Sequence, residues 1–408
     1  MTAGVVIVGG GQAGFQVAAS LRAEGYAGAV RLIGAETHPP YQRPPLSKGL
    51  LLGKMERERL LFRQPAFYEA QGIELVLGET VLAIDRGAKA VTTSTGRVLA
   101  YEALVIATGT RVRPLPVPGT ELDGVLYLRT LDESEDLAQR IAAAERVVVI
   151  GGGFIGLEVA AAARMLGRQV TVLEAADRLM GRAVAPVISA FYADLHRGRG
   201  VELALNAKIE RLEGADGRVT AVRMADGASH PADLVVIGIG VLPNVELAAA
   251  AGLACADGIL VDAHGRASDP AIFAAGECTS HPNRFAGGRV RLESVQNAVD
   301  QAKAVAAALL GKDQPYDEVP WFWSDQYEVK LQMVGISKGH DAQALRGDLA
   351  FGRFSVCYFK DGRLLAIDSV NRPGDHMVGR RLLGVGTTLT PAQAADESFD
   401  LKAALPAR

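Results

Sequence analysis

Short β-branched runs followed by glycines stand out along the chain, and the pattern occurs twice. Val5–Val8 leads into Gly9–Gly14, and Val147–Ile150 leads into Gly151–Gly156. Such a run ending in G-x-G-x-x-G is typical of a buried parallel strand that turns into a helix. The next segments predict helices and then returning strands, at Phe15–Ala23 and Val30–Ile33 in the first copy and at Leu157–Leu166 and Val170–Leu173 in the second. The chain therefore contains two βαβ units, about 140 residues apart.

Two further apolar runs that end in glycine mark where domains join. Ala103–Gly109 precedes a proline-rich linker, and Asp233–Gly240 precedes Leu242-Pro243-Asn244. We expect a first domain, residues 1–109 and 241–318, that is interrupted by a second domain, residues 110–240. After Pro320 the pattern changes, and residues 319–408 predict an α+β C-terminal domain with strands at Glu328–Val334, Phe351–Phe359 and Leu364–Val370. The predicted fold class is α/β, with two Rossmann-like dinucleotide-binding domains and this α+β tail.

The composition of the chain argues against a nucleic-acid-binding, membrane-spanning or secreted protein. With 408 residues and 49% apolar content the chain can bury several cores, and the net charge of −3 gives no general attraction to nucleic acid or to an anionic membrane. No apolar stretch is long enough to span a membrane, and Met1–Gly4 runs into the first strand without a basic segment, so no signal peptide is expected. Cys255, Cys278 and Cys357 fit no disulfide framework, which favours the reducing cytoplasm.

The glycine loops predict two dinucleotide sites. Their glycines allow a tight turn and a close approach of the backbone to a pyrophosphate, which then faces the amides and positive dipole end of a helix. A carboxylate about 20 residues further on is expected to bind the ribose. Glu174 ends the second returning strand and is followed by two alanines rather than an arginine, which favours NADH over NADPH. In the first copy Glu36 is the corresponding acid, although it comes later.

Seven segments spread over nearly the whole length carry recognisable motifs: Arg43–Lys48, Ala107–Gly109, Leu128–Leu131, Gly153–Val159, Gly240–Asn244, Glu293–Ala298 and Trp321–Tyr327. Together they resemble the flavin-dependent, NADH-using ferredoxin reductases that serve bacterial cytochrome P450s and aromatic-ring dioxygenases. The resemblance implies the two-dinucleotide architecture of glutathione reductase. It also implies that the first loop binds FAD and that the inserted domain binds NADH.

The resemblance also implies a set of cofactor-binding residues. For FAD these are Gly9, Gly11, Gln12, Ala13, Gly14, Glu36, Arg43, Lys48, Val81, Thr108, Gly109, Arg129, Glu277, Val295 and Trp323. For NADH they are Gly151, Gly153, Phe154, Ile155, Gly156, Glu174 and Gly240. Two positions depart from the family pattern: Glu277 stands where relatives have Asp, and Ala35 where many have Asp.

Lys48 and Glu158 are the predicted catalytic residues. By resemblance Lys48 lies near the flavin N5 edge, where a cation favours the reduced anionic ring, and Glu158 lies near the nicotinamide, as a partner of that lysine. The alternative for Lys48 is a solvent-exposed lysine on a helix surface. The alternative for Glu158 is an exposed glutamate in the first turn of a helix, where its charge interacts favourably with the helix dipole. Trp323 is either a core residue or a shield over the flavin.

The cysteines and basic residues bear on how electrons leave. No cysteine precedes Cys255, so the cysteine pair of flavoprotein disulfide reductases is missing and electrons must leave directly from the flavin. The resemblance implies that the acceptor is an acidic 2Fe–2S ferredoxin. The resemblance singles out Arg291 as the docking residue for that ferredoxin. For the neighbouring Arg284 and Arg289 a solvated surface is an equal alternative. The seven histidines show no ligand spacing, and no metal site is predicted.

Two alternatives stay open. A rubredoxin reductase or a monodehydroascorbate reductase differs only in its acceptor. A binding flavoprotein similar to apoptosis-inducing factor usually has a basic surface, which the charge of −3 does not support.

Overall fold

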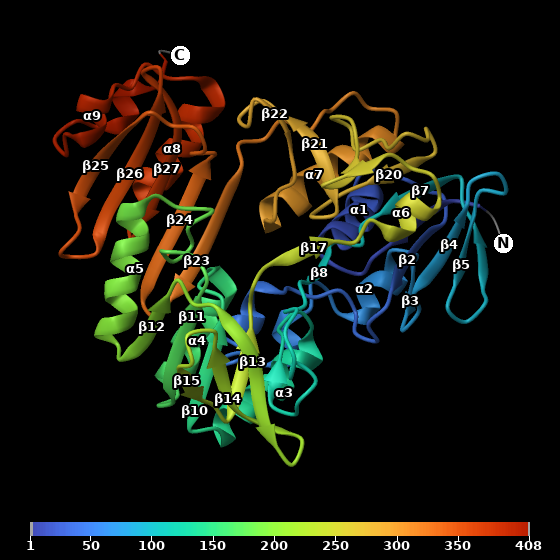
Figure 1. Cartoon of the computed structure of the whole chain (residues 1–408). Helices are drawn as coiled ribbons and strands as arrows, with labels where there is room; N and C mark the ends of the chain where they lie inside the picture. Colours follow the sequence, from blue (N-terminus) through green and yellow to red (C-terminus); the bar gives the residue numbers. More distant parts are fainter. Residues whose placement is uncertain (1–2, 407–408) are drawn as a thin grey trace. The chain divides into compact units, whose positions relative to one another are not determined.

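The structure is a computed structural model in which residues 3–406 are described (Figure 1). Met1 and Thr2, which belong to the segment that predicts no signal peptide, lie outside the described residues. The chain divides into two compact units. Unit 1 contains the described residues up to Gln42 together with Glu58–Arg111 and Pro243–Phe322, and unit 2 contains Arg43–Arg57, Val112–Leu242 and the described residues from Trp323 onward. The division into three domains stays a prediction.

Unit 1 is built on a parallel sheet in the order β20-β7-β1-β2-β3. Its strands are β1 (Val5–Val8), β2 (Val30–Gly34), β3 (Ile73–Leu77), β7 (Ala103–Ile106) and β20 (Ile272–Ala274). The first predicted βαβ unit is present, and β1 pairs in parallel with both β2 and β7. Helix α1 (Gln12–Ala23) begins three residues earlier than expected, because Gly11 already serves as its N-cap. Helix α7 (Val295–Leu309) packs against α1 (Figure 1).

Smaller elements complete unit 1. They are η2 (Arg57–Leu60), α2 (Pro65–Ala70), α6 (Glu246–Ala250), the sheet β4 (Val81–Asp85), β5 (Ala90–Thr93) and β6 (Val98–Ala100), and the sheet β18 (Cys255–Ala256), β19 (Gly258–Leu260), β21 (Thr279–Asn283) and β22 (Gly288–Val290). The chain passes between the units within β8 (Thr110–Val112) and returns within β17 (Val241–Pro243).

Unit 2 repeats the parallel sheet, in the order β12-β11-β10-β16-β9. The strands are β9 (Val125–Leu126), β10 (Arg146–Ile150), β11 (Gln169–Glu174), β12 (Val201–Leu205) and β16 (Leu234–Ile237). Helix α4 (Phe154–Met165) follows the second glycine loop and again begins three residues before the prediction, with Gly153 as its N-cap. The remaining elements are η1 (Pro44–Ser47), α3 (Leu131–Ala143), α5 (Pro186–Gly198) and the sheet β13 (Ile209–Ala215), β14 (Arg218–Met224) and β15 (Ser229–Pro231).

The C-terminal part of unit 2 is a five-stranded sheet in the order β23-β24-β27-β26-β25 (Figure 1). Its elements are β23 (Trp321–Gln326), β24 (Val329–Gly335), β25 (Ala342–Asp348), β26 (Arg353–Lys360), β27 (Arg363–Val370), α8 (Pro373–Val385), α9 (Pro391–Ala395) and η3 (Leu401–Ala404). The three predicted strands correspond to β24, β26 and β27. Between its exposed end residues, Arg353 and Lys360, strand β26 is buried. Helix α9 packs beside it, and Phe191 on α5 meets the Phe354 ring edge-on, with 5.2 Å between the ring centres.

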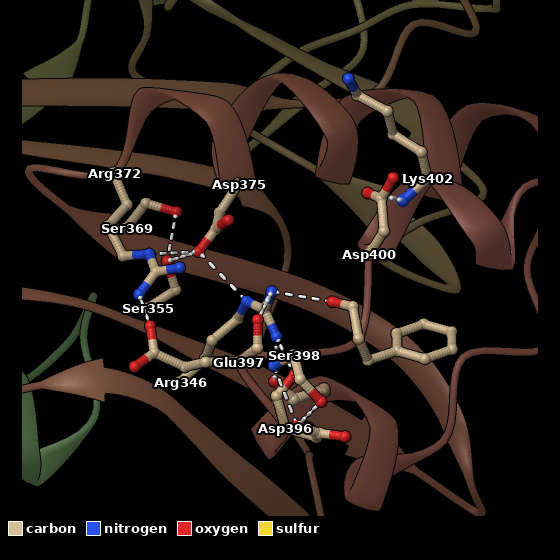
Figure 2. A network of polar contacts seen from close by, with 12 residues as sticks. Arg346, Ser355, Ser369, Arg372, Asp375, Asp396, Glu397, Ser398, Asp400 and Lys402 are labelled. Atoms are coloured by element: carbon tan, nitrogen blue, oxygen red, sulfur yellow. Dashed lines mark hydrogen bonds and ion pairs between the residues drawn. The ribbon is translucent and has the colours of Figure 1, made fainter.

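A buried arginine connects residues 394–399 to this sheet by hydrogen bonds (Figure 2). Arg346 on β25 is only 5% exposed, and its guanidinium donates to the backbone carbonyl oxygens of Asp396 and, at 2.9 Å, Phe399. Its Nε also lies 3.7 Å from a carboxylate oxygen of Asp375 on α8. Asp375 in turn accepts hydrogen bonds from Arg372 and Ser355. Residues 394–399 are thus held to the sheet by hydrogen bonds from this arginine.

Candidate functional site

The first glycine loop connects β1 to α1 in unit 1. A Cβ on Gly9 would lie 2.1 Å from the carbonyl oxygen of Ala107, and one on Gly14 would lie 1.9 Å from that of Gly9, so both positions require glycine. A Cβ on Gly11 would meet nothing within 4 Å, so the loop is open on the side of the helix N-terminus. Gln12 and Ala13 form the first turn of α1, which has no side-chain cap for its amides. This arrangement fits a dinucleotide pyrophosphate.

Residues expected to bind FAD cluster at the carboxyl ends of the unit 1 strands. Glu36 lies just beyond β2, and its carboxylate accepts a 2.5 Å hydrogen bond from the Tyr41 hydroxyl. Thr108 and Gly109 follow β7, and the Thr108 hydroxyl donates to the Asn244 carbonyl oxygen at 2.8 Å. Ligands bind at this edge of an open parallel sheet in other α/β proteins, which agrees with the expected placement.

Three further predicted FAD residues also lie in unit 1. Glu277 follows β20, where its longer carboxylate accepts a hydrogen bond from the Thr110 hydroxyl at 2.8 Å. Val295 is the first residue of α7, which Ser294 caps by accepting the Asn297 amide. Val81 begins β4 and is buried in the core.

The second glycine loop, in unit 2, has the same construction. A Cβ on Gly151 would lie 2.4 Å from the Gly238 carbonyl oxygen, one on Gly156 would lie 2.1 Å from that of Gly151, and Gly153 has open space. Phe154 and Ile155 begin α4, and Ile155 exposes 46% of its surface.

Glu174 ends β11 beside this loop, as expected for a ribose ligand. One carboxylate oxygen accepts the Gly152 amide at 2.5 Å and the other accepts the Ala176 amide at 2.7 Å. These two bonds fix the carboxylate, and each oxygen keeps a lone pair that could accept a ribose hydroxyl. Gly240 lies beyond β16 with φ at 101°, a conformation that favours glycine.

Glu158 is the most enclosed charged side chain among the predicted site residues, with 3% of its surface exposed. One carboxylate oxygen contacts the Lys48 ammonium at 2.7 Å and accepts the Ser47 hydroxyl at 2.6 Å. The other accepts the Ser324 hydroxyl, also at 2.6 Å. Lys48 keeps 20% of its side chain exposed, so the pair is buried on the glutamate side and accessible on the lysine side.

The short helix η1, which ends directly before this lysine, is held within unit 2 by hydrogen bonds. The Ser134 hydroxyl on α3 donates to the Leu46 carbonyl oxygen at 2.7 Å. Arg43 donates to the Arg129 carbonyl oxygen at 2.5 Å, which brings together two predicted FAD residues. Trp323, the fourth predicted FAD residue of this unit after Arg43, Lys48 and Arg129, lies half-buried on β23. Lys48 is therefore positioned by contacts from several elements.

The thiols show no sign of redox chemistry. All three cysteines are free. Burial raises the pKa of the Cys278 thiol, and it raises the pKa of Cys357 to about 12. Burial also raises the pKa of Cys255. A redox-active thiol needs a lowered pKa, so these three residues are poor candidates for a relay.

The predicted docking residue Arg291 has two acidic partners. Its guanidinium pairs with Asp257 at 2.8 Å and with Glu293 at 2.7 Å, and only 13% of its side chain is exposed. The neighbouring Arg284 is more exposed and pairs with Asp317 at 2.9 Å. The positive charge at this surface is therefore largely compensated.

Within residues 3–406 no group of three or more His, Cys, Asp or Glu side chains is arranged to hold a metal ion. The same part of the chain has no helix that combines the length and apolar character needed to cross a membrane.

Sequence reasoning missed the hydroxyl partners of Glu158. Ser47 and Ser324 both lie in segments that carry the family resemblance, but neither residue type signals a buried carboxylate. Gln326 and His196 continue the same network, through contacts between residues 130 positions apart along the chain. No spacing pattern marks such a contact.

Comparisons with known proteins agree with this geometry. Residues 3–302 match the family model described as pyridine nucleotide-disulphide oxidoreductase, and residues 321–405 match the model described as reductase C-terminal. The predicted fold class is confirmed by these matches and by the solved structures that resemble the chain.

Three similar proteins are reductases, and each aligns with this chain over nearly its full length. The chain is 48% identical to rhodocoxin reductase of Rhodococcus erythropolis, over 98% of this chain and 94% of that protein. The crystal structure of the ferredoxin reductase for the CYP199A2 system of Rhodopseudomonas palustris matches with a TM-score of 0.97 at 49% identity, covering 99% of this chain and 100% of that one. The reductase in a covalent putidaredoxin reductase–putidaredoxin complex matches with a TM-score of 0.96 at 45% identity, covering 98% and 97%. The resemblance predicted from the sequence is confirmed, and the chain belongs to the pyridine nucleotide-disulphide oxidoreductase family, among its ferredoxin reductases.

Proposed function

We propose that this protein is an FAD-dependent NADH:ferredoxin oxidoreductase that supplies electrons to a cytochrome P450 or an aromatic-ring dioxygenase. The observation that carries the proposal is the presence of two open glycine loops in a chain whose cysteines are unsuited to electron transfer. When bound, FAD accepts a hydride from NADH and passes the electrons on one at a time, as a 2Fe–2S ferredoxin requires. The names of the similar proteins support the same reaction.

The chain's own residues bind and orient the two nucleotides. In unit 1 the amides at the start of α1 would hold the FAD pyrophosphate, and Glu36, fixed by Tyr41, would hold its ribose. In unit 2 the start of α4 would hold the NADH pyrophosphate. Glu174 accepts ribose hydroxyls there and repels a 2′-phosphate, which is the basis for choosing NADH over NADPH.

We assign the Lys48 ammonium the task of presenting a fixed positive charge to FAD. Glu158 holds that ammonium in place through the 2.7 Å ion pair, and Ser47 and Ser324 hold Glu158. A preorganised charge stabilises developing negative charge without having to reorient during the reaction. Trp323 is proposed to shield the cofactor from water.

The proposed location is the cytoplasm, where a reducing environment keeps the three cysteines free. We retain the neighbourhood of Arg291 as the proposed docking site for an acidic ferredoxin. The compensation of its charge by Asp257 and Glu293 predicts a weaker electrostatic contribution than a free arginine would make.

The direct test is reduction of cytochrome c by NADH with and without a panel of 2Fe–2S ferredoxins. We expect NADH to bleach the yellow colour of the purified protein, and cytochrome c reduction to depend on an added ferredoxin. A preparation that binds FAD but is not bleached by NADH would contradict the proposal. Equal stimulation by rubredoxin would favour the rubredoxin reductase alternative.

A further inference from the structure

The hydrogen bonds around Glu158 continue into unit 2 through a chain of buried side chains. Ser324 and Gln326 lie two residues apart on β23, so they project from the same face of the strand, and both are fully buried. The Gln326 amide nitrogen lies 3.3 Å from the Ser324 hydroxyl oxygen. The Gln326 amide oxygen lies 2.9 Å from Nε2 of His196, a fully buried residue in the last turn of α5.

The direction of every donor in this chain follows from the carboxylate at its end. A carboxylate only accepts hydrogen bonds, so the single proton of the Ser324 hydroxyl points at Glu158. Ser324 must then accept from Gln326, and this orients the amide with its nitrogen toward Ser324 and its oxygen toward His196. The second amide hydrogen faces the sulfur of Met180 at 4.0 Å, so the amide has a partner for each hydrogen.

His196 must therefore carry its proton on Nε2, facing the Gln326 oxygen. Its Nδ1 atom faces the Tyr327 hydroxyl at 3.5 Å, and that hydroxyl is the donor in this contact. Burial lowers the pKa of His196, so the ring is neutral near pH 7. Tyr327 lies next to solvent in the turn after β23, with the Arg199 guanidinium 5.2 Å from its ring centre.

We propose that Tyr327, His196, Gln326 and Ser324 form a directional hydrogen-bond chain whose polarity is set by the charge of Glu158, and that His196 and Gln326 are positioning residues for the Lys48–Glu158 pair. The chain delivers one donor to Glu158 and so holds its carboxylate against the lysine. Its importance for flavin reduction rests on the proposed function. Its polarity does not, because that follows from the contacts alone.

The variant Glu158→Gln tests the polarity. Lys48 has only donors to offer, so the new amide must turn its oxygen toward Lys48 and its nitrogen toward Ser324. Ser324 then donates to Gln326, the Gln326 amide reverses, and its nitrogen faces Nε2 of His196. The histidine proton must consequently move to Nδ1. A neutral substitution at position 158 thus changes the tautomer of a histidine that it does not contact.

The measurement is ¹⁵N NMR of histidine-labelled holoprotein, with the His196 signals assigned by their loss in His196→Gln. We expect the Nε2–H tautomer in the wild type and the Nδ1–H tautomer in Glu158→Gln. The same tautomer in both proteins would overturn the proposal. This measurement needs neither NADH nor ferredoxin, so its result does not depend on whether the proposed function is correct.

A kinetic arm tests the positioning role. We expect Gln326→Leu and His196→Phe to slow flavin reduction at saturating NADH roughly 10-fold with little change in KM, and His196→Gln, which can still donate to Gln326, to recover most of the rate. The matched control is Ser189→Ala, because this buried hydroxyl also makes a 2.6 Å bond, to the Leu179 carbonyl oxygen, but lies outside the chain. Equal slowing by Ser189→Ala, or no slowing by Gln326→Leu, would contradict the positioning role.

Discussion

Unit 2 contains two buried polar networks that are built from different kinds of partner. The Arg346 guanidinium is held by backbone carbonyl oxygens of residues 394–399, which cannot change their hydrogen-bonding role (Figure 2). The Glu158 carboxylate is held only by side chains, two hydroxyls and an ammonium, from η1 and β23. Hydroxyl groups both donate and accept, so this second network can reorganise. We therefore expect loss of the first network to cost stability and loss of the second to cost rate.

The largest effect is expected for Arg346→Met. The substitution leaves the backbone carbonyl groups of residues 394–399 without this donor and removes a charge partner of Asp375, which should lower the free energy of unfolding by about 3 kcal/mol. Urea denaturation measures this loss, and the rate of flavin reduction per folded molecule should be unchanged. Arg97→Met is the control, because the Arg97 side chain is 40% exposed and solvent screens its ion pairs with Glu74 and Glu79, so they should contribute little to stability. Equal losses in the two variants would remove the distinction between the networks.

Glu174 is a carboxylate held by backbone amides, and it sharpens the contrast with Glu158. Glu174→Arg removes the ribose acceptor, so we expect KM for NADH to rise about 100-fold while bound FAD is retained. Stopped-flow reduction at varied NADH measures both the affinity and the maximal rate. Glu145→Arg, at the residue just before β10 of the same sheet, should leave KM unchanged. If Glu174→Arg has normal NADH kinetics, the assignment of this ribose site is wrong.

Lys48→Met removes the cation from the side-chain network. We expect flavin reduction by NADH to slow about 30-fold, since the fixed charge near the cofactor is lost. Rapid-mixing absorbance of the flavin gives the rate. Lys312→Met serves as the control, because Lys312 pairs with Glu24 at 2.8 Å on the surface of unit 1. Bleaching at the wild-type rate would refute the role assigned to Lys48.

Much of the fold follows from local sequence, and the site does so only in part. Both βαβ units lie within a few residues of their predicted ranges, because strand–glycine–helix signals are local. Strands β23 and β25 and helix α8 were not predicted. The aromatic run of β23 reads equally well as a core cluster, and α8 begins with Pro373-Gly374, which is typical of a turn.

The missing part of the site is set by tertiary contacts. The sequence marks Lys48 and Glu158 through the family resemblance, but it does not indicate that Ser324 completes their network 166 positions after Glu158. The inclusion of Arg43–Arg57 in unit 2 has the same cause, because the Ser134–Leu46 bond joins positions 88 residues apart.

Asp368 is a second buried carboxyl group in unit 2, but it has a single hydrogen-bond donor, the Tyr358 hydroxyl at 2.7 Å, where Glu158 has three donors. Burial raises the pKa of Asp368 to about 7 from its ordinary value of 3.8. The folded protein then retains a proton that the unfolded chain has lost, so wild-type stability should fall as the pH rises from 4 to 7, by roughly 3 kcal/mol. Thermal unfolding of Asp368→Asn across this range should lack the decline. If the stability of both proteins depends on pH in the same way, the raised pKa of Asp368 is not the cause of the decline.

The smallest effect is expected for Arg291→Ala. Its charge is already compensated by Asp257 and Glu293, so we expect KM for a ferredoxin to rise only about twofold at low salt. Ferredoxin-dependent cytochrome c reduction measures it, with Arg284→Ala for comparison. A rise of 10-fold or more would show that the docking role of Arg291 is stronger than its ion pairs suggest.

The central claim is that bound flavin is the only redox group of the protein, and an anaerobic reductive titration tests it directly. Dithionite added to the holoprotein should be consumed to two electrons per bound FAD, with no thiols released. Uptake of four electrons per FAD, with two new thiols, would demonstrate a disulfide relay and contradict the account.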